Sequence, residues 1–155
     1  MAERPEVGWQ WASPGYFDAM GIPLVKGRGF ADADLAGPAH VTLINETLAR
    51  LHFGNEDPIG RRIYFGRIPA AGVPEWHEII GVVGDVRHRS LEAEPDARAY
   101  DLFGQHWGRT ISLAIRSTAA TPAAATTVRS VLARHDPRLA VFAVRSTDEI
   151  VDNAV

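Results

Sequence analysis

Apolar residues alternate with polar or small residues at two places in the chain. The first group comprises Val7, Trp9 and Trp11, and the second comprises Ile111, Leu113 and Ile115. A period of two is typical of a β-strand with one face toward solvent. The pattern therefore predicts a strand near the start of the chain and another over residues 110–117.

Two continuous apolar runs predict buried strands. Val41–Ile44 is compact, and Trp76–Val86 is rich in β-branched residues, which favour strands. Asn45 follows the first run and can cap a helix whose apolar residues keep helical spacing as far as Gly54. We therefore predict a strand–helix unit at this point in the chain.

A hairpin is predicted ahead of the second apolar run. Asp57-Pro58-Ile59-Gly60 has the residues of a turn, and Arg62–Phe65 is suited to a short strand. Residues 66–75 are rich in Gly, Pro and Ala, which predicts the loop between this strand and Trp76.

Residues typical of helix ends predict two short helical segments in the first part of the chain. Ser13 can cap a helix with Pro14 at its first position, and Gly21 ends it. Residues 32–36 can form one further turn before Gly37-Pro38.

The last part of the chain is predicted to continue with helix, strand and helix. Thr121-Pro122 begins a long helix that Asp136-Pro137 stops. A strand follows at 141–144, and a last helix at 146–155 begins near Ser146 or Thr147.

These elements predict an α+β fold with mixed or antiparallel sheets. The order strand–helix–strand over residues 110–145 is typical of a β-α-β plait. We expect the helices to cover one face of the sheet.

Composition and charge narrow the classes of function. A chain of 155 residues is sufficient for one core or two small lobes. Its net charge of −3 is scattered along the sequence, which argues against a nucleic-acid partner. Cysteine is absent, so packing alone must stabilise the fold. The longest apolar stretch, near Ile79–Val83, is far below the ~20 residues that cross a bilayer, and no secretion signal is expected at the start.

No motif in the chain indicates catalysis. Gly81–Asp85 contains two glycines but lacks the spacing and the following helix of a phosphate-binding loop. Ser13, Ser90 and Ser112 lie in neither a GxSxG nor an SxxK motif. We therefore expect no enzyme activity, no catalytic residue and no cofactor.

Two further groups of residues are candidates for binding sites. His77, Asp85 and His88 lie close in sequence, but zinc needs three or four convergent ligands, so we expect a solvated strand end and no metal site. Aromatic residues could line a ligand cleft, although core or interface anchors are the favoured interpretation. They are Trp9, Trp11, Tyr16, Phe17, Trp76 and Trp107, the last a candidate for contact with a partner.

Four segments together carry a family resemblance. They are SPGYFDAMGIPLVKGRGF (13–30), VTLINETLARLHFGNEDPIGRRIYFG (41–66), HEIIGVVGDVRHRSL (77–91) and VRSVLARHDPRLAVFAVRSTDEIV (128–151). In order and spacing they resemble the MacB-like periplasmic core domain of ABC transporter permeases, which also carry an FtsX-like transmembrane part. Each segment is short, but their joint order covers nearly the whole chain.

The resemblance implies an extracytoplasmic domain between the first and second transmembrane helices of a permease. The chain would then be a fragment of a longer protein, and the family's opening strand and helix have no counterpart in it. Residues 1–30 and 96–155 are expected to form a porter-like lobe, with residues 31–95 as an inserted small α/β lobe.

The resemblance also implies a function without catalysis, in which the domain transmits ATP-driven movement of membrane helices for export or extraction of a substrate. Its partners would be the transmembrane helices of the same permease and, indirectly, an ABC ATPase, together with a second permease copy and a periplasmic adaptor. The alternative is an extracytoplasmic ligand-binding or sensor module, with the aromatic residues as walls of its cleft.

Overall fold

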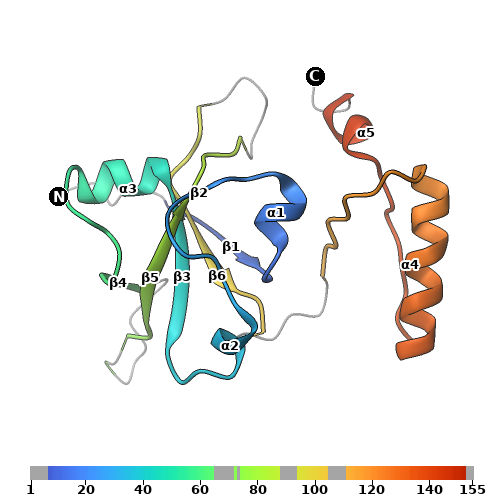
Figure 1. Cartoon of the computed structure of the whole chain (residues 1–155), viewed down its shortest axis with the longest axis horizontal. Helices are drawn as coiled ribbons and strands as arrows, with labels where there is room; N and C mark the ends of the chain where they lie inside the picture. The colour runs from blue at the N-terminus through green and yellow to red at the C-terminus, as the bar shows by residue number, and fades with distance from the viewer. Residues whose placement is uncertain (1–6, 65–71, 73, 88–93, 105–110, 153–155) are drawn as a thin grey trace. The chain divides into compact units, whose positions relative to one another are not determined.

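The computed structural model describes residues 7–64, 72, 74–87, 94–104 and 111–152 (Figure 1). The chain divides into two compact units, one formed by Met1–His88 and Ala93–Ala114 and the other by Arg89–Glu92 and Ile115–Val155. The first unit contains β1 (Gly8–Ala12), α1 (Tyr16–Met20), β2 (Leu24–Gly27), α2 (Asp32–Leu35), β3 (His40–Asn45), α3 (Glu46–Phe53), β4 (Arg62–Tyr64), β5 (Trp76–Val83) and β6 (Arg98–Leu102). The second contains α4 (Thr121–His135) and α5 (Thr147–Asp152).

The six strands form one mixed sheet in the order β1-β6-β3-β5-β2, with β4 also paired to β5. The pairs β1–β6 and β3–β5 are parallel, and the other pairs are antiparallel. Strand β4 pairs with the first residues of β5 and β2 with its last residues. The predicted α+β class with a mixed sheet is confirmed, as is the hairpin formed by β4 and β5.

Helices cover both faces of this sheet, whereas the sequence led us to expect one covered face. Phe17 of α1 belongs to one apolar cluster and Leu48 of α3 to the other, and Figure 1 shows the two helices on opposite sides of the strands. The reason is the composition of β3, whose neighbouring residues Leu43 and Ile44 are both fully buried and point to opposite faces.

The start of α1 differs from the prediction, and its end confirms it. Gly15, with φ of 82°, is the N-cap residue, and no side chain caps the helix. The backbone carbonyl of Ser13 accepts a hydrogen bond from Tyr16 N at 3.1 Å, so Ser13 and Pro14 form the turn before the helix. Gly21 ends the helix in the left-handed conformation (φ 71°, ψ 26°), which suits glycine.

Two predicted strands are wrong. Residues 111–117, the described part of the first, and 141–144 have no strand structure. Apolar residues in both segments are exposed, as Leu113 and Phe142 show, and Ala143 has a φ of 53°, which interrupts an extended chain. Helix α4 between them and helix α5 after them are confirmed. Ser146 and Glu149 cap α5 reciprocally, because each side chain bonds the backbone N–H of the other residue.

Strand β6 was not predicted, and it joins segments that we had assigned to separate lobes. The one sheet combines strands from residues 1–30, from residues 31–95 and from the segment after residue 96. The boundaries of the two compact units therefore differ from those of the predicted lobes, and the porter-like assignment stays a prediction. No helix in the described part of the chain is long and apolar enough to cross a membrane.

Candidate functional site

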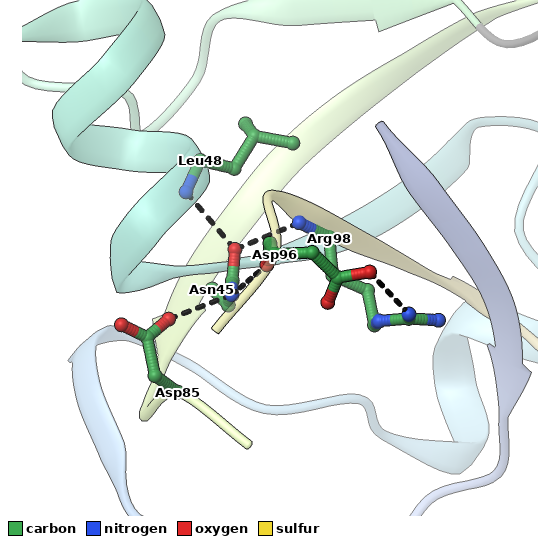
Figure 2. Close-up of polar contacts among 5 residues, drawn as sticks. All are labelled: Asn45, Leu48, Asp85, Asp96 and Arg98. Carbon is green, nitrogen blue, oxygen red and sulfur yellow. Dashed lines mark hydrogen bonds and ion pairs between the residues drawn. The ribbon is translucent and has the colours of Figure 1, made fainter. Parts of the chain in front are cut away.

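A buried polar junction forms where β3 ends and α3 begins (Figure 2). Its centre is Asn45, which is 1% exposed. The side-chain Oδ1 accepts hydrogen bonds from Leu48 N at 3.0 Å and from Arg98 N at 2.9 Å. The Nδ2 donates to Asp85 Oδ1 at 2.6 Å and to the Asp96 carbonyl at 2.9 Å. The amide thus fills both of its donor and both of its acceptor positions.

Asp85 supplies the negative charge of the junction. Besides the bond from Asn45, its carboxylate accepts from Thr47 N at 3.0 Å and from Thr47 Oγ1 at 2.8 Å. The N-terminus of a helix favours a carboxylate, because its first N–H groups have no partner within the helix. We expected a solvated strand end at this position, and that prediction is wrong because Asp85 is bonded to the start of α3.

The junction also fixes the start of β6. The backbone N–H of Arg98 donates a hydrogen bond to Asn45 Oδ1, and its guanidinium lies 2.7 Å from the Asp96 carboxylate. Four segments therefore meet at one point: the end of β3, the start of α3, the residues after β5 and the start of β6. Hydrogen bonds join these four segments to one another, so we interpret the junction as a structural element that makes this end of the sheet rigid.

The sequence indicated only the local part of this junction. Asn45 was predicted as the N-cap of α3, and its bond to Leu48 confirms that role. The bonds to Asp85 and Asp96 connect residues about 40 to 50 positions apart along the chain, and no local pattern marks such a pairing.

The glycines of Gly81–Asp85 serve close packing. A Cβ added to Gly81 would lie 2.4 Å from the Arg28 carbonyl oxygen and 2.7 Å from Leu43 Cδ2. This segment is the end of β5 and the residues that follow it, which agrees with our preference for a close-packed strand over a phosphate loop.

The candidate metal group of His77, Asp85 and His88 is not assembled as the sequence suggested. His77 lies near the start of β5 and Asp85 beyond its other end, while His88 lies outside the described residues. Of the serines considered as nucleophiles, Ser13 and Ser112 are exposed, and Ser90 also lies outside the described residues.

A pocket of about 240 Å³ lies beside α1. Its walls include Phe17, Phe30, Leu24 and Val83. Of the aromatic residues that we considered for a cleft, Phe17 alone lines it among the described residues. The volume is below the ~300 Å³ at which ligand pockets of drug-sized molecules begin.

The other aromatic residues lie in the core or on the surface. Tyr16 and Phe17 pack edge-on with ring centroids 5.3 Å apart, and Phe17 packs against Tyr100 at 5.0 Å. Burial raises the pKa of Tyr100, so its hydroxyl stays neutral. Trp9 and Trp11 are partly exposed on β1, with centroids 4.9 Å apart.

Trp76 is exposed at the start of β5, where it packs edge-on against Tyr64 at 5.3 Å. Trp107, which we considered for contact with a partner, lies outside the described residues.

Comparison with known proteins identifies the family to which the sequence is similar. The model of the MacB-like periplasmic core domain matches residues 3–131. The macrolide export ATP-binding/permease protein MacB of Aggregatibacter actinomycetemcomitans is 31% identical over 70 residues, which are 45% of this chain and 10% of that protein. The protein of the same name from Neisseria meningitidis serogroup A is 26% identical over 121 residues, 77% of this chain and 19% of the relative.

A solved structure has the same fold. The periplasmic region of MacB from Actinobacillus actinomycetemcomitans superposes with a TM-score of 0.55 at 18% identity, over 79% of this chain and 54% of that one. The chain thus spans less than a fifth of the length of these curated relatives.

Proposed function

Since the chain belongs to the MacB-like periplasmic core domain family of ABC transporter permeases, we propose that it transmits ATP-driven movement of membrane helices and performs no catalysis. The match to residues 3–131 carries this proposal, because the matched relatives are named as ATP-binding/permease proteins. By the same reasoning the domain lies on the extracytoplasmic side, and the movement serves export or extraction of a substrate.

The contacts of the first unit support a mechanical role. A part that conveys movement has to keep its own shape. The Asn45 junction links the end of β3, the residues after β5 and the start of β6 to α3 by buried and partly buried hydrogen bonds. Apolar clusters on both faces of the sheet add to this rigidity.

The partners proposed for the chain follow from the family. They are the transmembrane helices of the same permease and, through them, an ABC ATPase. A second permease copy and a periplasmic adaptor would add contacts on the exposed surface. The alternative, a ligand-binding sensor, receives little support from the small pocket beside α1.

Distance measurements in the intact permease test the mechanical proposal. The chain contains no cysteine, so spin labels can be placed by Leu51→Cys on α3 and Arg129→Cys on α4, both exposed positions. In a permease otherwise free of cysteine, we expect the distance between these labels to change when ATP is added.

The control pair is Leu51→Cys with Met20→Cys, on α3 and α1 of the same unit, whose distance should stay constant. If both pairs give identical distances with and without ATP, the proposed transmission of movement through this chain is wrong.

A further inference from the structure

A second cluster of polar side chains lies at the end of the sheet opposite the Asn45 junction. His40 begins β3 and His77 lies near the start of β5, and the parallel pairing of these strands places the two residues opposite each other. Their ring centroids are 5.2 Å apart. Glu75 immediately precedes β5, and its Oε1 lies 2.9 Å from Nε2 of His40.

The three side chains have the spacing of a metal site. One ligand atom from each of His40, Glu75 and His77 lies within 4.8 Å of the other two. Zinc binds imidazole nitrogen and carboxylate oxygen at about 2.0–2.2 Å, so two ligands of a tetrahedral ion lie about 3.3 Å apart. Small rotations of the half-exposed Glu75 and His40 side chains can close the remaining difference.

A fourth residue, Asp101, contacts the ring of His77. Asp101 of β6 has its Oδ1 2.8 Å from Nδ1 of His77, and these side chains are 1% and 4% exposed. Metal-binding histidines typically have their other ring nitrogen held by a carboxylate, which fixes the tautomer and the ring orientation. In that arrangement Nε2 of His77 is the atom that binds the ion.

We propose that His40, Glu75 and His77 bind one zinc ion, with Asp101 orienting His77. Two imidazoles and one carboxylate suit zinc, whereas magnesium and calcium prefer oxygen ligands alone. The ion would link the residue before β5 to the start of β3. No local pattern in the chain indicates this group, because His40 reaches His77 only through the pairing of β3 with β5.

Calorimetry and thermal unfolding with zinc chloride test the site in the tag-free, chelator-treated chain. We expect one zinc ion to bind per chain and Tm to rise by about 5 °C or more at saturating zinc, because the ion binds only the folded state. Magnesium chloride and calcium chloride at the same concentration should leave Tm unchanged.

Variants at the two partly exposed ligands separate binding from folding. Glu75→Gln and His40→Gln should each weaken zinc binding at least about tenfold and abolish the rise in Tm, while the metal-free Tm stays close to that of the original chain. His52→Gln, at an exposed position on α3, is the matched control and should bind zinc unchanged. The proposal is overturned if zinc does not bind, or if it binds equally well to Glu75→Gln and His40→Gln.

Discussion

At the scale of single residues, Asp85 is the carboxylate acceptor of the junction at the end of the sheet. It accepts hydrogen bonds from Asn45 Nδ2, Thr47 N and Thr47 Oγ1. We expect Asp85→Ala to lower the free energy of unfolding by about 2–3 kcal/mol, because these donors lose their acceptor in a partly buried place. Urea unfolding followed by circular dichroism measures the change.

Asp18→Ala is the matched control for this prediction. Asp18 is an exposed carboxylate on α1, so its removal should change stability by less than about 0.5 kcal/mol. Equal stability of the two variants would contradict the structural importance of the junction.

Gly81 is a position in β5 where a single added carbon would meet backbone atoms. Its Cβ would overlap the Arg28 carbonyl oxygen and the Leu43 side chain, at 2.4 and 2.7 Å. We expect Gly81→Ala to lower the free energy of unfolding by about 3 kcal/mol, because backbone must move to make room. Gly29→Ala provides the comparison, since no heavy atom lies within 4 Å of its Cβ position. Superimposable thermal melts of the two variants would show that the strand packing is assigned incorrectly.

At the scale of elements, α1 is attached to the sheet by Phe17. Its ring lies 5.0 Å from that of Tyr100 and 6.2 Å from that of Phe30, measured between centroids. Phe17→Ala should lower the free energy of unfolding by about 3–4 kcal/mol, the usual range for a buried phenylalanine. Met20→Ala on the same helix removes a side chain that is 46% exposed and should have a small effect. A comparable loss in both variants, measured by urea unfolding, would contradict this attachment.

Helix α2 is held to the end of β2 by a pair of charges that gives a pH dependence. The Arg28 guanidinium contacts both oxygens of Asp34, at 2.7 and 2.8 Å, and these hydrogen bonds hold the pKa of Asp34 below its usual range. Because the folded state has the lower pKa, the stabilisation is present above the unfolded pKa of about 3.9 and is lost as pH falls through the folded value.

Asp34→Asn should therefore be less stable than the original chain at pH 7, by up to about 1 kcal/mol, and the difference should disappear in strong acid. Thermal unfolding from pH 7 down to pH 2 checks this course. Asp32→Asn on the same helix is the control, and a difference between original and Asp34→Asn chains that persists at pH 2 would contradict the assignment.

The sequence was most informative where local and long-range requirements agree. Asn45 ends an apolar run and caps the following helix, so β3 and α3 could be predicted from neighbouring residues. Strand β6 could not be predicted in this way, because Arg98 and Asp101 interrupt its apolar residues. In the folded chain Arg98 pairs with Asp96, and Asp101 pairs with His77. Conversely, the apolar residues at 111–117 and 141–144 predicted strands, although an apolar pattern alone supplies no neighbouring strand to accept the backbone hydrogen bonds.

At the scale of the whole molecule, we expect the chain to release no phosphate from ATP. The glycines near Asp85 pack within and beside β5, where they offer no cradle of N–H groups to a phosphate. A phosphate-release assay on the purified chain should give the rate of buffer alone, with a known ATPase as the positive control. Turnover that co-purifies with the chain would contradict a non-catalytic role.

The parallel pairing of β1 with β6 determines how the first unit would respond to tension. Gly8 pairs with Arg98 and Ala12 with Leu102, so the leading end of β1 and the trailing end of β6 lie at opposite ends of the pair. A pull on the segment before β1 and on the segment after β6 would therefore slide one strand along the other. In that geometry all the hydrogen bonds between the two strands bear the load together and must break together, whereas a peeled hairpin gives way one bond at a time.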